Sequence, residues 1–342
     1  MKECFQIKKH IIIPIFVPHK GCPFDCIFCN QKIISGQTNE ASEEDIRGTI
    51  ESHLETSGNA FVEIGFYGGS FTGISLKEQE WYLQIGYSYI KSGKVNQIRL
   101  STRPDYINST ILDLLERYGV KTIELGVQSL DYDVLKCTNR GHGIEEVKNA
   151  AKMIKDRGFS LGIQTMIGLP GDTGSKSIET AQKVVELAPD IVRIYPTLVI
   201  ENTYLQKMYT DGRYQPLTIE EAVNISAELL DIYEQNNINV IRIGLQPTDN
   251  ISESGEVVAG PFHPAFRQLV ESRLTLKRIK QYIINNKLNQ LPEIIIQCNP
   301  RYISTVIGQK RVNINTLKNE FNFKNIRIME KLNVEKFEII GT

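Results

Sequence analysis

The stretch CPFDCIFCNQ, residues 22–31, directly follows the first predicted strand and places Cys22, Cys26 and Cys29 in the spacing CxxxCxxC. These are three of the six cysteines in the chain. In a reducing compartment, clustered cysteines favour a metal or redox site over disulfide cross-links, because thiolates bind soft and borderline metals. A loop that follows a strand in this way is typical of the active-site face of a parallel β/α barrel. The stretch therefore predicts a metal centre at the carboxyl end of the first strand.

The number of thiols indicates which kind of metal centre to expect. Structural zinc sites usually have four protein ligands, but no fourth cysteine lies near this motif. An iron–sulfur cluster held by three cysteines has one iron free to bind a small molecule. The alternatives are a zinc site completed by His19 or Cys137, and cysteines that are simply buried.

Length and composition define the broad class of protein. The chain has 342 residues, of which 41% are hydrophobic and 23% charged, and these values are ordinary for a globular protein large enough for one barrel with an appended unit. They exclude a disordered chain and a disulfide scaffold. The amino-terminal apolar run is short, is interrupted by Pro14, and is not followed by a small-residue cleavage site. We therefore expect a cytoplasmic protein with no membrane partner.

The charge is distributed unevenly along the chain. Residues 261–342 contain 14 Lys and Arg against 6 Asp and Glu, whereas residues 1–260 contain 25 against 34. A basic carboxyl-terminal region can bind an acidic partner such as tRNA or another RNA. The alternative is a solvated surface that happens to be basic.

Extended apolar runs alternate with amphipathic runs, which is the pattern of successive β/α units around a parallel sheet. The predicted strands are His10–His19, Ala60–Tyr67, Gln97–Arg103, Thr122–Ser129, Ser160–Leu169 and Ile191–Ile200. The predicted helices are Glu43–Glu55, Lys77–Lys91, Ser109–Tyr118, Glu145–Arg157, Lys176–Leu187 and Ile219–Gln235. A further apolar run, Asn239–Gly244, adds a strand or closes the sheet.

These elements predict an α/β fold with two parts. The first, residues 1–246, is a partial (β/α)6 TIM-like barrel, and the second, residues 247–342, is a small α/β extension. A connector rich in Ser, Glu and Gly, Pro247–Gly260, separates them. The extension is predicted to contain a helix, a strand and a second helix, at Phe266–Asn286, Glu293–Cys298 and Val312–Phe321.

Polar residues recur on one face of several predicted strands. Alternate residues of a strand face opposite sides of the sheet, so Ser101, Glu124, Gln164, Arg193 and Tyr195 are expected on the inner face of the barrel. A filled barrel interior normally consists of Val, Ile and Leu. The pattern therefore predicts a lumen that holds a polar ligand, with Glu124, Gln164, Arg193 and Tyr195 as candidate catalytic residues. The alternative is a set of buried polar pairs that satisfy one another.

The cysteine motif, with the aromatic Phe28 before its last cysteine, resembles the signature of radical S-adenosylmethionine (radical SAM) enzymes. The resemblance implies a [4Fe–4S] cluster on Cys22, Cys26 and Cys29 and a barrel of the radical SAM type. It also implies that the free iron chelates S-adenosylmethionine, that an external one-electron donor reduces the cluster, and that cleavage gives a 5′-deoxyadenosyl radical. Phe28 would pack near the adenine. The hard chemistry in such enzymes belongs to the cofactor, while the protein orients it and selects the substrate.

A second motif, YGGSFTG at residues 67–73, ends the second predicted strand. It resembles the glycine-rich stretch that contacts the methionine end of S-adenosylmethionine in these enzymes. By this resemblance Gly68, Gly69 and Ser70 are cofactor-binding residues. Glycines allow the backbone to approach a ligand closely, although paired glycines also mark ordinary turns.

Longer segments resemble the radical domain of the Elongator catalytic subunit, a tRNA wobble-uridine modifying enzyme, over residues 10–245. By position, Gln128 and Arg140 would contact the ribose and the methionine carboxylate, and Arg193 corresponds to a basic residue near the cluster. Ser101 is a cofactor-binding candidate that departs from the pattern, because the family usually has an acidic residue there. The segments that carry the resemblance are STRPDYI (101–107), ELGVQSLDYDVLKCTNRGH (124–142), GLPGDT (168–173) and YPTLVIENTYLQKMYTDGRY (195–214).

The resemblance predicts a radical SAM enzyme that modifies tRNA or another RNA. The chain resembles short bacterial members, and we expect neither the acetyltransferase-like domain nor the preceding RNA-binding segment of Elongator-type enzymes. Two alternatives stay open. One is radical modification of a small molecule or a protein side chain, and the other is a non-catalytic iron–sulfur protein.

Overall fold

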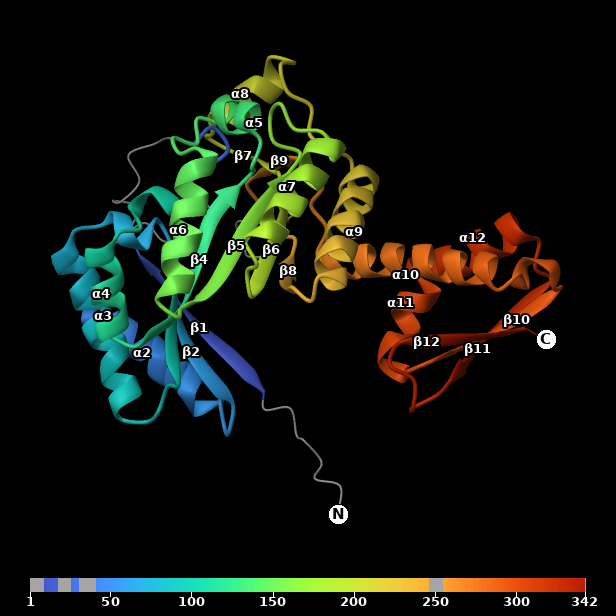
Figure 1. Ribbon diagram of the computed structural model, residues 1–342, viewed down its shortest axis with the longest axis horizontal. Coiled ribbons are helices and arrows are strands. Elements are labelled where there is room, and N and C mark those ends of the chain that lie inside the picture. The colour runs from blue at the N-terminus through green and yellow to red at the C-terminus, as the bar shows by residue number, and fades with distance from the viewer. Residues whose placement is uncertain (1–8, 18–25, 31–40, 246–254, 342) are drawn as a thin grey trace.

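The computed structural model describes residues 9–17, 26–30, 41–245 and 255–341. Its main element is a seven-stranded parallel sheet in the order β1-β2-β3-β4-β5-β6-β8, curled into a half-barrel (Figure 1). The predicted α/β half-barrel is confirmed, and the apolar run after the sixth strand forms the seventh. The strands are β1 (His10–Val17), β2 (Phe61–Gly68), β3 (Gln97–Thr102), β4 (Val120–Gln128), β5 (Ser160–Ile167), β6 (Ile191–Pro196) and β8 (Asn239–Ile243).

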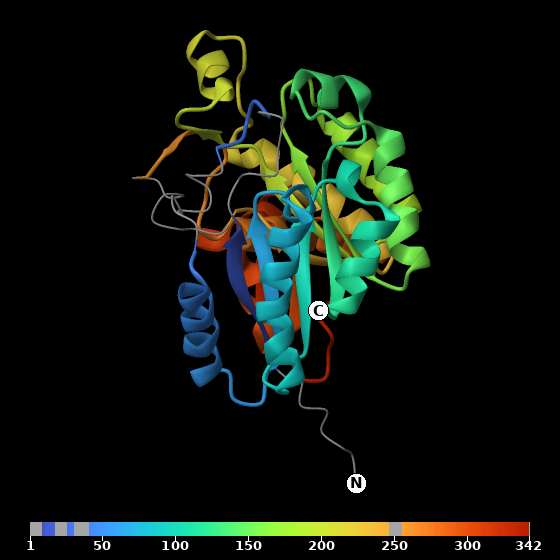
Figure 2. The same ribbon diagram turned by 90° about the vertical axis from the view of Figure 1, so that its left-hand side faces the viewer.

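Helices pack along the outer side of the curled sheet (Figure 2). Several begin with a capping box, in which a Ser or Thr hydroxyl and a carboxylate three residues later satisfy each other's backbone N–H groups, as Ser75 and Glu78 do before α3. The helices that follow strands are α2 (Glu43–Glu55), α3 (Leu76–Lys91), α4 (Ser109–Arg117), α6 (Ile144–Asp156), α7 (Gly174–Glu186) and α9 (Ile219–Gln235). Shorter elements are η1 (Phe71–Gly73), η2 (Pro104–Tyr106), α5 (Tyr132–Cys137) and α8 (Tyr204–Thr210).

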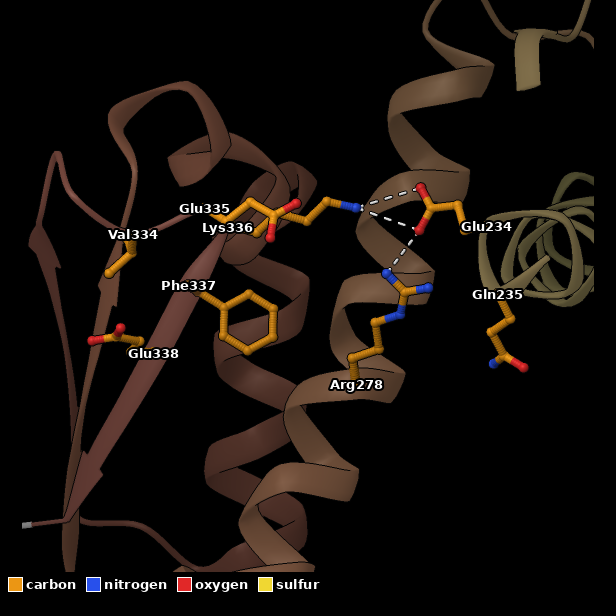
Figure 3. Close-up of a pocket in the computed structure, with 8 residues that line it drawn as sticks. All are labelled: Glu234, Gln235, Arg278, Val334, Glu335, Lys336, Phe337 and Glu338. Carbon is orange, nitrogen blue, oxygen red and sulfur yellow. Dashed lines mark hydrogen bonds and ion pairs between the residues drawn. The ribbon is translucent and has the colours of Figure 1, made fainter. Parts of the chain in front are cut away.

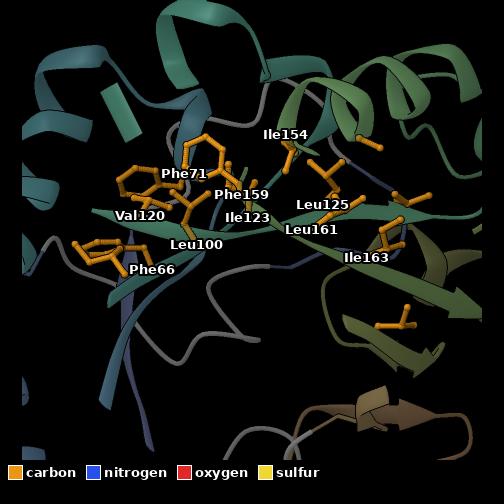
Figure 4. Close-up of a cluster of buried hydrophobic side chains, with 14 of the residues drawn as sticks. Phe66, Phe71, Leu100, Val120, Ile123, Leu125, Ile154, Phe159, Leu161 and Ile163 are labelled. Carbon is orange, nitrogen blue, oxygen red and sulfur yellow. The ribbon is translucent and has the colours of Figure 1, made fainter. Parts of the chain in front are cut away.

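The hydrophobic core lies between the outer face of the sheet and these helices (Figure 4). Leu125 of β4 and Ile163 of β5 belong to it, together with Ile154 of α6. The inner face of the sheet is consequently free for polar side chains, because alternate residues of each strand point the other way.

The sixth predicted strand is shorter than expected. The predicted strand Ile191–Ile200 is wrong at its carboxyl end, because β6 ends at Pro196 and a separate two-residue strand, β7 (Val199–Ile200), follows. Pro196 has no N–H with which to extend the parallel ladder. β7 pairs antiparallel with β9 (Val257–Ala259) instead.

The carboxyl-terminal unit has its own sheet and its own core. Three strands in the order β11-β10-β12 pack against three helices around a second cluster of buried apolar residues. The first of these helices is shared, since Val270 packs in the barrel core and Ile279 in the second core. The elements are α10 (Phe266–Asn285), η3 (Leu288–Gln290), β10 (Glu293–Cys298), η4 (Pro300–Tyr302), α11 (Ile303–Ile307), η5 (Gln309–Arg311), α12 (Val312–Phe321), β11 (Asn325–Glu330) and β12 (Phe337–Gly341).

Ion pairs join the barrel to this unit. Asp231 of α9 accepts hydrogen bonds from Arg278 at 2.7 Å and Lys277 at 3.2 Å, and Glu234 of the same helix pairs with Arg278 at 2.8 Å and with Lys336 at 3.4 Å. Figure 3 shows the open pocket of about 470 Å³ that Glu234, Arg278 and Lys336 border. None of the helices in the described part of the chain is long and apolar enough to cross a membrane.

Candidate active site

The described part of the cysteine motif, residues 26–30, is held at the end of the barrel by backbone hydrogen bonds. The N–H of Ile27 donates to the carbonyl of Thr138 at 3.3 Å, and its carbonyl accepts from the N–H of Leu205 at 2.7 Å. The N–H of Cys29 donates to the carbonyl of Cys26 at 2.9 Å, so both thiols lie on one turn. Phe28 is buried beside them, whereas Cys22 lies outside the described residues.

Arg140 connects this turn to the end of β4. Its Nη1 donates to the Cys26 sulfur at 3.4 Å, although the two residues are 114 positions apart. Its Nη2 donates to the carbonyl of Gly126 at 2.5 Å. Cysteine sulfur is a ligand for soft and borderline metals. The structure therefore brings together two residues, Cys26 and Arg140, that the sequence placed at the same site.

Gln128 lies next to Arg140 over the same glycine. A Cβ atom on Gly126 would lie 2.9 Å from Nη2 of Arg140 and 3.2 Å from Nε2 of Gln128, so a larger residue would displace both side chains. Gln128 has a left-handed backbone with φ of 68°, at a register shift between β4 and β5. This irregularity turns its side chain at the strand end.

Two buried polar atoms in this region have no hydrogen-bond partner among the described residues: Oε1 of Gln128 and Nε of Arg140. Buried polar groups are nearly always satisfied in native proteins. An acceptor and a charged donor left unsatisfied on two residues that both approach Gly126 therefore indicate a polar ligand.

His142 lies two residues beyond Arg140, and its Nε2 is also buried without a partner in the described structure. Burial lowers its pKa to about 4, and the nearby charges of Arg140 and Arg103 contribute to the shift. The imidazole is therefore neutral at neutral pH.

The glycine-rich stretch YGGSFTG connects β2 to η1. Gly68 has φ of 101°, and a Cβ atom there would lie 2.9 Å from the carbonyl of Val17 on β1, so the glycine is needed for strand packing. Gly69 is buried. The Ser70 hydroxyl shares a hydrogen bond of 2.8 Å with Thr102 and accepts one of 3.1 Å from the N–H of Arg103. These contacts hold the stretch against the end of β3, while its cofactor contacts stay a prediction.

A network of buried charges crosses the inner face of the sheet, with Glu124 at its centre. Oε1 of Glu124 accepts hydrogen bonds from Arg99 at 2.8 and 3.0 Å, from Nη2 of Arg193 at 3.1 Å and from the Tyr67 hydroxyl at 3.4 Å. Its Oε2 accepts from Nε of Arg193. The ion pair between Arg193 and Glu124 is a buried polar pair of the kind predicted as the alternative to a lumen that holds a polar ligand.

This environment keeps Glu124 ionised. Burial opposes the charge, but Arg193 and Arg99 outweigh burial and lower the pKa of the carboxyl below its usual value. Burial also opposes the charge of Arg193, and Glu124 nevertheless raises the pKa of that guanidinium. A carboxylate with this many donors is poorly suited to transfer protons, so the geometry favours a positioning role for Glu124 over general acid or base catalysis.

The other inner-face candidates flank this network. The Tyr195 hydroxyl lies 3.5 Å from Nη1 of Arg193. Gln164 of β5 stands in register between Gly126 of β4 and Arg193 of β6. Ser101 stands in register with Glu124. The structure therefore gathers all five predicted lumen residues on adjacent strands.

Sequence reasoning missed several members of the network, among them Arg99, Glu63 and His10. Arg99 is 4% exposed and also donates from Nη1 to Glu63 at 3.0 Å. Nε2 of His10 lies 2.6 Å from the same carboxylate. The strand alternation contains a signal for two of them. Arg99 is two residues before Ser101 and therefore lies on the same strand face, and Glu63 lies on the same strand face as Tyr67.

The comparisons with known proteins identify the family of the chain. Residues 16–184 match the radical SAM superfamily, and residues 189–275 match the Radical_SAM C-terminal domain. The chain therefore belongs to the radical SAM superfamily and is an enzyme of that class, as the cysteine motif predicts. Its cofactors are those of the superfamily, a [4Fe–4S] cluster and S-adenosylmethionine.

Within the superfamily, the chain is similar to Elongator-type radical domains. It is 30% identical over 188 residues to a tRNA uridine(34) acetyltransferase of Methanocaldococcus infernus, which covers 48% of this chain and 34% of the relative. It is 32% identical over 209 residues to Elongator complex protein 3 of Saccharomyces cerevisiae, which covers 55% of this chain and 37% of the relative. The chain thus spans about a third of the length of these relatives.

Two further relatives extend the likeness. An uncharacterized protein of Methanocaldococcus jannaschii is 30% identical over 224 residues, which is 64% of this chain and 65% of that protein. The solved structure of archaeal Methanocaldococcus infernus Elp3, with residues 1–46 deleted, shares the fold with a TM-score of 0.63. That structure is 22% identical, and the superposition covers 82% of this chain and 64% of the other.

The residues present fit the two cofactors. Cys26 and Cys29 supply two thiols on one turn, one of them beside a guanidinium, and the unpaired atoms of Gln128 and Arg140 suit a polar ligand next to it. Among the described residues no group of three His, Cys, Asp or Glu side chains is placed to hold a metal. The third thiol of the motif, Cys22, is outside that part of the chain.

Proposed function

We propose that this enzyme reductively cleaves S-adenosylmethionine and uses the resulting radical to modify a nucleotide of tRNA or another RNA. The observation that carries the proposal is the contact between Arg140 and the Cys26 thiol, beside the unsatisfied Oε1 of Gln128. It joins the cysteine motif to a polar binding site at the carboxyl ends of the strands. This is where barrels of parallel strands bind their substrates.

In this proposal Cys22, Cys26 and Cys29 hold the cluster, and Phe28 packs beside the adenine. When bound and reduced by an external one-electron donor, the cluster would supply the electron that breaks the sulfonium bond. Arg140 and Gln128 then bind and orient S-adenosylmethionine, with Arg140 supplying positive charge and Gln128 a hydrogen-bond acceptor. The hydrogen bond from Arg140 to Cys26 would couple the position of S-adenosylmethionine to that of the cluster.

The network around Glu124 would set the electrostatics of the substrate site. Paired residues on adjacent strands share a face, so Arg242 of β8, in register with Arg193, joins the inner face. The charged residues on this face of the strands are then Arg99, Arg193 and Arg242 against Glu63 and Glu124. An excess of positive charge suits a phosphate-bearing substrate. Tyr195 and Gln164, at the edge of the network, would contact it.

The RNA substrate is supported by two independent observations. The similar proteins include a tRNA uridine(34) acetyltransferase and Elongator complex protein 3. The carboxyl-terminal region is strongly basic, with 14 Lys and Arg against 6 Asp and Glu in residues 261–342. The proposal places the enzyme in the cytoplasm, where thiols stay reduced and tRNA is present.

The test is release of 5′-deoxyadenosine by the anaerobically reconstituted, reduced chain, with and without total tRNA from cells lacking the gene. The wild type is expected to release more product with tRNA. Cys26→Ala should release none, and Cys137→Ala is the matched control, because Cys137 is exposed and outside the motif. Activity of Cys26→Ala equal to wild type would refute the radical reaction. Equal release with and without tRNA would refute the RNA substrate and favour a small molecule or protein side chain.

A further inference from the structure

The carboxyl-terminal unit has a topology with a known binding mode. Strand β10 leads into α11, a four-residue turn follows, and α12 leads back into β11. β10 and β11 are neighbours and run parallel, so the two short helices form the crossover between them. Strand, helix, short glycine-containing turn, helix and strand are the elements of KH nucleic-acid-binding modules, in which the turn clamps the backbone of about four nucleotides.

The turn itself consists of Gly308, Gln309, Lys310 and Arg311. Gly308, Lys310 and Arg311 all have positive φ, at 76°, 51° and 62°. The side chains of Gln309, Lys310 and Arg311 are exposed. In the GXXG turn of KH modules the fourth position is glycine. Here Arg311 keeps the left-handed backbone that glycine favours and adds a guanidinium.

The turn is anchored from the inside by Asn313. Its buried Nδ2 donates to the carbonyls of Ser272 at 3.1 Å, Thr305 at 3.1 Å and Val306 at 3.2 Å. These contacts tie the start of α12 to α11 and to α10. The polar anchoring holds the turn in place while its cationic side chains stay in solvent, as a preformed binding surface requires.

The charge around the turn is mostly positive. Residues 299–328 contain six Lys and Arg and one acidic residue, Glu320, which is paired with Lys280. In the described structure no carboxylate pairs with Arg301, Lys310 or Arg311. Beside the turn, Val312 is 51% exposed. Free cations next to an exposed apolar side chain suit the phosphates and bases of a single strand.

We propose that this unit binds a single-stranded RNA segment of about four nucleotides at the Gly308–Arg311 turn. The cations of Lys310 and Arg311 contact phosphates, and Val312 contacts a base. The proposal gives a specific binding site to the RNA of the proposed function. It rests on that function only for the identity of the RNA that is bound in the cell. Binding itself needs neither the cluster nor S-adenosylmethionine, so it is tested separately from the radical reaction.

The experiment measures binding of the full chain to a fluorescent 12-nucleotide RNA, by anisotropy, as a single strand and as a duplex at several salt concentrations. Lys310→Asp is the test variant, because Asp tolerates a left-handed backbone. Lys287→Asp is its matched control: Lys287 is exposed, has φ of 54°, and lies beyond the end of α10. That end is about 20 Å along the helix from Ser272, which anchors the turn.

The wild type is expected to prefer the single strand. Lys310→Asp should weaken binding about tenfold and reduce the slope of log K against log salt by about 0.7, the value for one phosphate contact on a single strand. Lys287→Asp should change neither. Arg311→Gly is a second variant with an unstrained turn, and it should also weaken binding while keeping the melting temperature of the wild type.

Three outcomes would overturn the proposal. One is absence of RNA binding by the wild type. Another is equal loss of affinity in Lys310→Asp and Lys287→Asp, which would mean general attraction to a basic surface. The last is equal affinity for the duplex and the single strand.

Discussion

Replacement of Glu124 by Gln is expected to destabilise the barrel more than replacement of its partner Arg193 by Met. Without Glu124, Arg193 loses its ion-pair partner in a site where its side chain is 12% exposed. Breaking a buried pair in this way typically costs about 3–5 kcal/mol. Without Arg193, Glu124 keeps two hydrogen bonds from Arg99, at 2.8 and 3.0 Å. The expected cost of Arg193→Met is therefore about 2 kcal/mol, close to that of one hydrogen bond to a charged group.

The double variant distinguishes this network from independent contacts. Glu124→Gln/Arg193→Met removes both charges of the pair, so its cost should be about 2 kcal/mol less than the sum of the single costs. The free energy of unfolding is measured in urea by tryptophan fluorescence. The single tryptophan, Trp81, lies in α3 against the barrel core and therefore reports the barrel. Additivity within about 0.5 kcal/mol, or a cost below about 1 kcal/mol for Glu124→Gln, would show that the two charges do not depend on each other in this way.

Three further predictions concern the cofactor site. Gln128→Asn, which suits the left-handed backbone at this position, should raise the Kd for S-adenosylmethionine several-fold and leave the iron content unchanged; loss of iron would mean that Gln128 supports the cluster. Gly126→Ala should weaken S-adenosylmethionine binding in the same way, because its Cβ would lie 2.9 Å from the Arg140 guanidinium, and unchanged calorimetric affinity would contradict this. His142 has a folded-state pKa of about 4 against an ordinary 6.5, so below pH 6.5 the unfolded chain takes up a proton that the folded chain does not. The free energy of unfolding of the apoprotein should therefore fall by about 2 kcal/mol between pH 7 and pH 5, and His142→Gln should remove that part of the slope. An identical slope in both proteins would show that His142 is not buried and neutral.

The fold was largely predictable because each of its signals is local. Alternating apolar runs located the strands, and capping residues such as Ser75 and Thr218 mark helix starts in the sequence itself. The predicted strand Ile191–Ile200 ends early at Pro196. The effect of a proline on pairing depends on which edge of the strand bonds to a neighbour. Which edge pairs is decided by the arrangement of the sheet, and the sequence of the strand alone does not reveal it.

The sequence places the candidate site residues in motifs and on strand faces, but it does not predict which of them pair. Period-two alternation places Glu124 and Arg193 on one face, yet the link between them depends on the order of the strands in the sheet. The contact from Arg140 to Cys26 joins residues 114 positions apart, and the unpaired state of Gln128 depends on a register shift at the end of β4. Such long-range contacts are set by tertiary packing, which local sequence does not encode.

Mass spectrometry of the nucleosides of tRNA tests whether the radical reaction changes RNA. Total tRNA from cells lacking the gene is incubated with reduced enzyme and S-adenosylmethionine, and in parallel with Cys26→Ala. At least one nucleoside should change mass with the wild type and none with the variant. Release of 5′-deoxyadenosine with every nucleoside unchanged would contradict this expectation.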